Sequence, residues 1–209
     1  MELFILIFTA LFSVMNPFGT VPVFVSLTEE NTKLERNKIA LWTSLNVLII
    51  LVISFFIGKY ILLFFGITLN SLKIAGGLII ASSGFALLTG EFSKHKGMKK
   101  TRVMEDIESR SQISLTPLAV PMIAGPGTMS ILITYNQEIN GLNNMLIILG
   151  AIILSSIFIY IILKSSFFIV KVLGASGINA LSRIIGFIVI AIGVEFIISA
   201  VGSVFNFNQ

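Results

Sequence analysis

Six long apolar stretches constrain this chain more than any other feature of its sequence. A helix that crosses a bilayer needs about 20 predominantly apolar residues, and the stretches predict spans at residues 3–27, 39–62, 68–90, 113–135, 143–165 and 180–203. Only 11% of the residues are charged, whereas soluble domains carry about 25%. The sequence therefore predicts an all-α membrane protein, with residues 1–209 forming a single integral membrane domain.

The residue inventory excludes several kinds of chemistry. Cysteine is absent and His95 is the one histidine, so we expect no disulfide, no thiolate chemistry, no zinc or iron site and no cofactor. No Walker A loop occurs, which argues against ATP as the direct energy source. The N-terminal stretch begins with an acidic residue and is expected to be a retained first helix.

The basic residues predict the orientation in the membrane. With six crossings, the connectors at 28–38, 91–112 and 164–183 share one side and hold 12 of the 14 Lys and Arg residues, leaving Lys59 and Lys73 on the other. Basic residues accumulate on the cytoplasmic side, so both termini are expected outside the cytoplasm. The net charge of +4 is then a matter of topology, and we expect no nucleic acid partner.

The chain also resembles itself at an offset of 109 residues. The matches are Ala10 with Ala119, Pro17 with Pro126, Asn70 with Asn179, Leu72 with Leu181, Gly77 with Gly186, Ile79 with Ile188 and Gly84 with Gly193. Three helices per copy is an odd number, so the second copy enters from the opposite face, as in many secondary transporters. We expect two inverted three-helix repeats, about 1–90 and 113–203, joined by a cytoplasmic connector at 91–112. A rival topology makes each opening segment a re-entrant hairpin.

Helix-breaking residues occupy matched positions in the two copies. "MNPFGT" (15–20) aligns with "AGPGTM" (124–129), so helices one and four are expected to be broken near the midplane. Backbone opened at that depth is tolerated when it is buried in protein or lines a cavity. The freed N–H groups suit a carboxylate and the freed carbonyls suit an ammonium group or cation. The predicted solute-binding residues are Asn16, Pro17, Gly19, Thr20, Gly125, Pro126, Gly127 and Thr128.

The alternative interpretation is that the two motifs are simple packing kinks, since Pro and Gly are common in transmembrane helices. Hydroxyl side chains nearby serve either as ligands or as hydrogen bonds between helices; they are Ser13, Thr20, Thr128, Ser130 and Thr134.

Three charged residues fall within or beside the predicted spans. Glu195 is the one acid deep inside a span, which makes it a candidate for ion coupling, with a buried structural carboxyl as the alternative. Lys73 and Arg183 are expected to extend to the interface.

Glycines recur seven residues apart in the third and sixth spans, at Gly77 and Gly84 and at Gly186 and Gly193. Such stripes of small residues predict close helix packing between the two halves.

Four blocks of sequence carry a resemblance to a known family: "NPFGTVPVFVSLT", "FGITLNSLKIAGGLIIASSGF", "PLAVPMIAGPGT" and "GINALSRIIGFIVIAIGVEFII". They resemble the MarC-like family of bacterial inner-membrane proteins, which belongs with the LysE-type exporters. The resemblance implies a six-helix, multi-pass protein of the bacterial inner membrane. It also implies neutral amino acid transport driven by a cation gradient, as described for some archaeal relatives. At the position of Glu195 the family has either an amide or an acid.

Three classes of function follow from these features. The leading expectation is a secondary transporter or exporter of a small polar solute, with neutral amino acids as the expected substrate class, driven by H⁺ or Na⁺. A non-transporting membrane scaffold or assembly protein is the alternative. An intramembrane enzyme is disfavoured, because the one Asp and the one His both fall in the 91–112 connector. The expected partners are the solute, the coupling ion and the lipid bilayer, and the oligomeric state stays open.

Overall fold

The structure, a computed structural model, describes residues 2–89, 118–119, 123–139 and 141–205. Within these residues the regular structure is all helical, as the composition predicts, with π-helical turns at Leu118, Ala119 and Ile123 and α-helices elsewhere. They are α1 Glu2–Met15, α2 Pro17–Leu27, α3 Lys33–Phe65, α4 Leu69–Thr89, α8 Pro126–Glu138, α9 Leu142–Lys164 and α10 Ser166–Val204. The predicted connector at 91–112 lies outside the described residues.

Five of the predicted spans have counterparts that are long and apolar enough to cross a membrane. They are Glu2–Leu27, Lys33–Phe65, Leu69–Thr89, Leu142–Lys164 and Ser176–Val204. The sixth, at 113–135, lies partly outside the described residues. Its described part includes the start of α8, whose 13 residues extend about 20 Å at 1.5 Å per residue, too short for a crossing.

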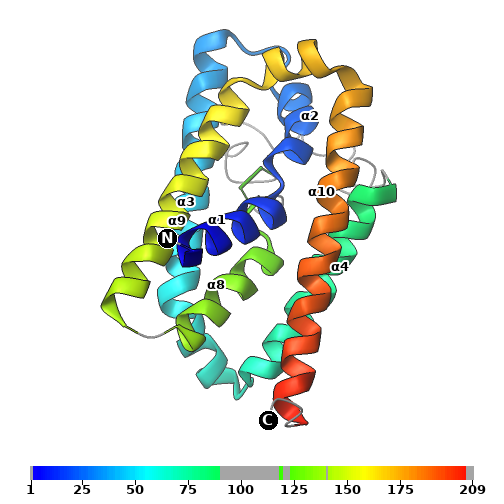
Figure 1. The fold of residues 1–209 in the computed structure, drawn as a ribbon. Helices are drawn as coiled ribbons and strands as arrows, with labels where there is room; N and C mark the ends of the chain where they lie inside the picture. Colours follow the sequence, from blue (N-terminus) through cyan, green and yellow to red (C-terminus); the bar gives the residue numbers. More distant parts are fainter. Residues whose placement is uncertain (1, 90–117, 120–122, 140, 206–209) are drawn as a thin grey trace.

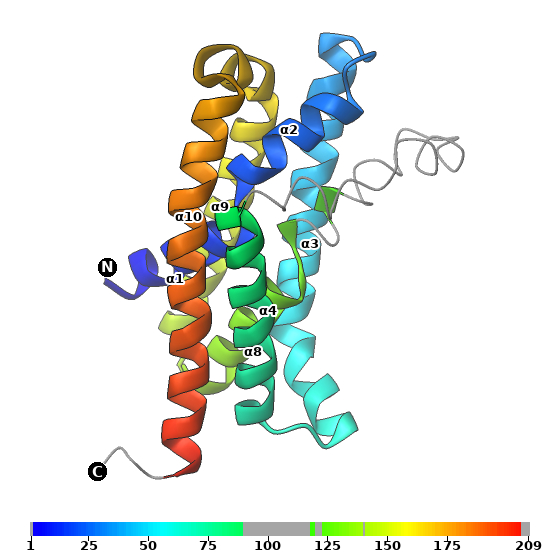
Figure 2. The same cartoon turned by 90° about the vertical axis from the view of Figure 1, so that its right-hand side faces the viewer.

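The long helices form a bundle that the short helices enter at its middle. Figures 1 and 2 show α3, α4, α9 and α10 running along the bundle, while α1 lies across it near mid-height. From that level α2 runs toward one end and α8 toward the other. The two short helices thus point in opposite directions from a common level.

Local features fix the two ends of α3 and a kink in α10. A capping box closes the start of α3, where Thr32 and Glu35 each bond the other's backbone N–H, which satisfies donors that a helix start leaves free. Gly66 ends α3 with φ +66°, a left-handed conformation that glycine adopts without steric cost. A kink at Gly174, with φ +63°, lies inside α10, and the membrane-length part begins at Ser176.

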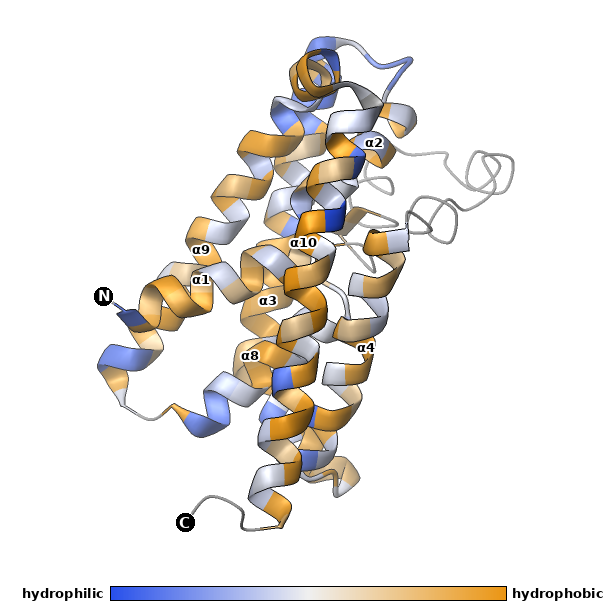
Figure 3. Cartoon of the chain, turned by 45° about the vertical axis from the view of Figure 1, so that its right-hand side comes forward, coloured by the Kyte–Doolittle hydropathy of each residue, from blue (hydrophilic) through white to orange (hydrophobic). Residues whose placement is uncertain are grey.

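The buried core joins all parts of the bundle, and its outside is apolar. Core side chains from α1, α3, α8 and α9 include Leu11, Leu51, Ile131 and Ile152, each 0% exposed. Large apolar side chains are also exposed, and Figure 3 shows hydrophobic colours predominating along the long helices, with hydrophilic colours mostly toward the ends. Exposed apolar surface on this scale fits a lipid environment.

The predicted glycine stripes pack against each other, which confirms that expectation. A Cβ atom built on Gly77 would lie 2.6 Å from the carbonyl oxygen of Gly193, and one built on Gly84 would lie 2.7 Å from that of Gly186. Real Cβ contacts are longer than this, so α4 and α10 reach this separation because both carry glycine where they cross.

Candidate functional site

The first break separates α1 from α2 at Asn16. This residue has φ 40° and ψ 66°, and it is the one non-glycine residue with positive φ in the described chain. Its Oδ1 atom accepts a hydrogen bond from the backbone N–H of Gly19 at 3.2 Å, and Pro17 occupies the first turn of α2. Asparagine tolerates the left-handed conformation and caps helix starts, so the sequence Asn-Pro ends one helix and begins another.

The second break opens α8 by a different route. Gly125 precedes the helix in an extended conformation, with φ −80° and ψ 174°, and makes no side-chain cap. Pro126 lies in the first turn of α8, and the Thr128 hydroxyl donates to the Ile123 carbonyl at 3.2 Å. Proline is well suited to the first helical position because it has no N–H to leave unpaired.

The two breaks are neighbours. A Cβ built on Gly127 would lie 3.6 Å from Cγ1 of Val14, next to Met15 at the end of α1. In both Figure 1 and Figure 2 the start of α2 and the start of α8 lie near mid-height. The last turn of α1 therefore packs against the first turn of α8, and the N-terminus of α8, whose first backbone N–H groups lack intrahelical partners, lies beside the first break inside the bundle.

The side chains around the breaks are polar and deeply buried. Asn16 is 2% exposed, Thr20 0%, Thr128 1%, Ser130 2% and Thr134 1%. Pro17, Gly19 and Gly127 are also buried, while Gly125 is half-buried and Pro126 is exposed. The buried Asn16 Nδ2 and Thr134 Oγ1 atoms have no hydrogen-bond partner among the described residues. Buried polar atoms are normally paired, so each of these two atoms retains hydrogen-bonding capacity for a further polar group.

Glu195 lies apart from this cluster. Its position on α10 is exposed, whereas Gly193, two residues earlier, packs on α4. The carboxyl therefore projects from a different side of the helix than the one that contacts α4, and among the described residues it forms no ion pair.

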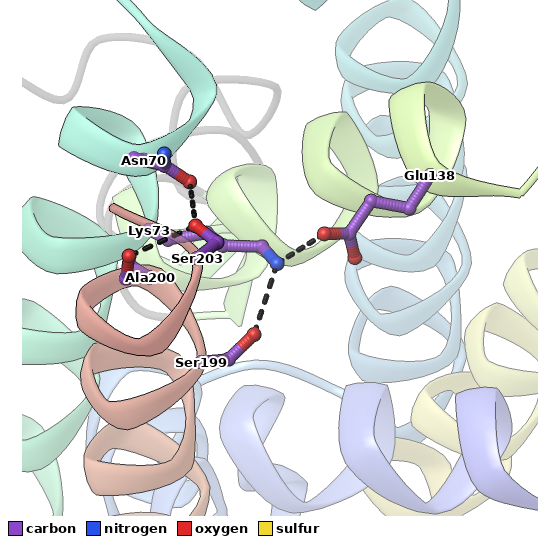
Figure 4. A network of polar contacts seen from close by, with 6 residues as sticks. All are labelled: Asn70, Lys73, Glu138, Ser199, Ala200 and Ser203. Atoms are coloured by element: carbon purple, nitrogen blue, oxygen red, sulfur yellow. Dashed lines mark hydrogen bonds and ion pairs between the residues drawn. The ribbon is translucent and has the colours of Figure 1, made fainter. Parts of the chain in front are cut away.

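The expectation that Lys73 extends to the interface is wrong. Lys73 on α4 is 6% exposed, and its ammonium forms an ion pair with Glu138, the last residue of α8. It also donates to Ser199 Oγ on α10 at 3.2 Å. Figure 4 shows the ammonium pointing toward both partners. The Lys73 ammonium is therefore held between α4, α8 and α10 by the partly exposed Glu138 carboxylate and Ser199, and its side chain does not extend to the interface.

Sequence reasoning did not single out Glu138. It falls three residues beyond the predicted span 113–135, where an acid is ordinary, and its partner lies 65 positions away. The one available signal was Lys73 itself, a lysine in the first turns of an apolar helix. If such a lysine is buried, it requires an acidic partner.

A second polar contact joins α4 and α10 nearby. Ser203 Oγ donates to Asn70 Oδ1 at 2.9 Å, and it also contacts the carbonyl of Ala200 at 2.9 Å. At this end of the bundle, polar contacts thus join α4 to α8 and α4 to α10.

The described residues contain no group of three or more His, Cys, Asp or Glu side chains placed to hold a metal ion.

Comparison with known proteins identifies the family. Residues 1–205 match the model of the MarC family integral membrane protein. The chain is 35% identical to the UPF0056 membrane protein BU267 of Buchnera aphidicola, over 98% of this chain and 94% of the relative. It is 34% identical to the UPF0056 membrane protein YhcE of Escherichia coli, over 95% and 91%.

A third relative carries the location in its name. The chain is 34% identical to the UPF0056 inner membrane protein MarC of Citrobacter koseri, over 89% of this chain and 88% of the relative. No solved structure matches the chain. From its nearly full-length match, the chain belongs to the MarC family of integral membrane proteins.

Proposed function

We propose that this protein is a secondary transporter or exporter of a small polar solute, with neutral amino acids as the substrate class and H⁺ or Na⁺ as the driving ion. The observation that carries the proposal is that the last turn of α1, which ends at the Asn16–Pro17 break, packs against the proline-initiated start of α8. At this break the Nδ2 atom of buried Asn16 has no hydrogen-bond partner among the described residues. Helix N-termini and an amide donor suit a carboxylate. The carbonyls that end α1 suit the ammonium group of the same solute.

We further propose that the bundle is built from two inverted repeats. Three helix starts support this, because α2, α3 and α4 begin at Pro17, Lys33 and Leu69. Adding the offset of 109 gives 126, 142 and 178, and α8, α9 and the membrane-length part of α10 begin at residues 126, 142 and 176.

The glycine crossing supports the same symmetry. Gly77 meets Gly193, the counterpart of Gly84, and Gly84 meets Gly186, the counterpart of Gly77. Such reciprocal contacts are what a two-fold relation between copies requires. The pairing of α3 with α8 and of α9 with α2 is reciprocal in the same way.

The proposed orientation puts the end that holds the α2–α3 and α9–α10 junctions in the cytoplasm. Both junctions lie at one end of the bundle and α10 ends at the other (Figure 1), which supports an outside C-terminus. The start of α1 lies near mid-height, so the outside position of the N-terminus rests on the charge pattern alone.

We keep Glu195 as the proposed ion-coupling residue. A charged side chain deep in a bilayer costs about 2.5–3.5 kcal/mol on insertion scales, and Glu195 lies inside the span Ser176–Val204. A carboxyl at this depth that binds a proton in one state of the transport cycle and releases it in another would couple proton movement to solute transport.

The second candidate is a non-transporting scaffold. It is favoured by the glycine crossing of α4 and α10, where backbone lies against backbone and leaves no room for a solute. A scaffold does not use the hydrogen-bond donors at the helix breaks to bind a solute. Changes at the breaks that leave insertion intact should therefore affect a transporter and not a scaffold.

The test is flux through purified protein in liposomes, with a panel of radiolabelled neutral amino acids under H⁺ or Na⁺ gradients. We expect uptake of at least one of them by the unmodified protein. The double variant Pro17→Ala and Pro126→Ala should lose that uptake while inserting normally, because both helix starts lose the residue that opens them. Pro22→Ala is the matched control, since Pro22 lies inside α2 and away from either helix start. No flux under any gradient would contradict transport and favour the scaffold.

A further inference from the structure

The ion pair of Lys73 and Glu138 has properties that a simple structural salt bridge does not need. The two residues belong to different helices, and the exposed fractions of their side chains are unequal, 8% for Lys73 and 42% for Glu138. The lysine is thus fixed inside the protein, while the glutamate reaches it from the surface. Glu138 is the last residue of α8, so its side chain is less confined than one in mid-helix.

The pair also retains hydrogen-bonding capacity. An ammonium group has three donors, and Lys73 directs two of them to Glu138 and Ser199. A carboxylate offers about four acceptor positions, and the ammonium of Lys73 takes one of those of Glu138. Both charged groups therefore retain hydrogen-bonding capacity for a further ligand, and Lys73 can bind one while it keeps its bond to Ser199.

From this arrangement we propose that Lys73 and Glu138 form an outer binding site for a zwitterionic solute, whose carboxylate binds Lys73 and Ser199 and whose ammonium binds Glu138. The inference rests on the proposed transport function and names a second solute site, separate from the helix breaks. Along α8 the site is 12 residues from Pro126, about 18 Å at 1.5 Å per residue. It lies at the end of the bundle where α10 terminates (Figure 1).

Charge balance explains why a zwitterion fits. When it inserts between the two residues, the Lys73 ammonium and the Glu138 carboxylate each exchange one opposite charge for another, so neither is left unpaired. A cationic ligand without a carboxylate would leave the ammonium of Lys73 buried without an anion, which is costly. An anionic ligand without an ammonium would leave Glu138 unpaired, but that carboxylate is 42% exposed and keeps contact with water.

The site therefore predicts an unequal selectivity. Removing the solute carboxylate should weaken binding about 30-fold or more, as expected when a buried charge loses its partner. Removing the solute ammonium should weaken it about fivefold or less, as expected for an exposed pair. Alanine, alaninamide and propionate are the matched probes, because each of the last two lacks one of the two charges.

The experiment measures equilibrium binding of radiolabelled alanine to purified protein, with alaninamide and propionate as competitors. It is done in the Asn16→Gly background, which removes the amide donor at the helix breaks and so isolates the outer site. We expect saturable alanine binding there with the unequal selectivity described above. Adding Lys73→Met should abolish that binding. Adding Lys59→Met, the same change at the other lysine on the outer side, should leave it intact.

Lys73→Met is chosen because it removes the buried charge and leaves a half-exposed glutamate, so folding is preserved; a single elution peak and an unchanged melting temperature check this. Alanine binding that persists with Lys73→Met overturns the outer site, and so does complete loss of binding with Asn16→Gly alone. Neither result contradicts the proposed transport function if the unmodified protein transports alanine in the liposome assay. Absence of binding and of flux in the unmodified protein overturns both.

Discussion

Replacing Asn16 separates the two roles that we assign to this residue, which are to hold the break and to contact the solute. Its backbone is left-handed, at φ 40°, a conformation that costs a residue with a Cβ roughly 1–2 kcal/mol and costs glycine almost nothing. Its side chain caps α2 through Gly19, and losing a cap costs about 1 kcal/mol for alanine and a few tenths for glycine.

The two substitutions should therefore differ in stability. Asn16→Ala is expected to be less stable than Asn16→Gly by about 1–2 kcal/mol, from the backbone conformation alone. For a chain of this length that difference corresponds to roughly 2–8 °C in melting temperature. Either change also removes the buried Nδ2 atom, which has no partner among the residues that the structure describes. Burial of an unpaired donor costs roughly 1–3 kcal/mol, so Asn16→Gly should be as stable as the unmodified protein or more so.

Transport activity should not follow the order of stability of the two variants. If Nδ2 donates to the solute, both variants lose transport, and a stable Asn16→Gly protein that does not transport shows that the unpaired atom is retained for binding. Melting temperatures of the purified proteins in detergent and flux in liposomes measure the two effects. Equal melting temperatures for the two variants would refute the left-handed break, and full transport by Asn16→Gly would refute the amide as a solute ligand.

Two further outcomes follow from the helix contacts and from the acid in the last span. Gly84→Ala should destabilise the protein by about 1–3 kcal/mol, because its Cβ would lie 2.7 Å from the Gly186 carbonyl oxygen; Gly150→Ala, with its nearest neighbour at 3.5 Å, is the control. Equal melting temperatures for these two variants would contradict the close crossing of α4 and α10. Glu195→Gln should remove the dependence of uptake on a proton gradient, and uptake that still follows the gradient would exclude Glu195 as the coupling residue.

The positions of most helices could be predicted from the sequence because they depend on local properties. A run of about 20 apolar residues has one stable form in a bilayer, since a helix satisfies all its backbone groups. This is why the predicted span 143–165 and α9, Leu142–Lys164, differ by one residue at each end. The breaks at Asn16 and Gly125 were predictable for the same reason, because Pro and Gly act on the backbone beside them.

The charged residues were predicted less well because their state depends on what packs around them. Lys73 near a helix start suggested an interfacial side chain, and instead it is buried against Glu138 and Ser199. No pattern along the chain connects residues 65 positions apart, and only the packing of α4, α8 and α10 brings them together. The Nδ2 atom of Asn16 is a similar case, since burial without a partner is a property of the surroundings.

By itself, then, the sequence determined that the chain is helical, lies in a membrane and belongs to its family. It also determined the breaks at Asn16 and Gly125, because apolar length and the backbone limits of Pro and Gly act locally. The tertiary structure alone decided that the end of α1 packs against the start of α8, that α4 and α10 cross at glycine, and that Lys73 pairs with Glu138. These last features depend on contacts between distant segments, whose free energy arises only when the helices pack.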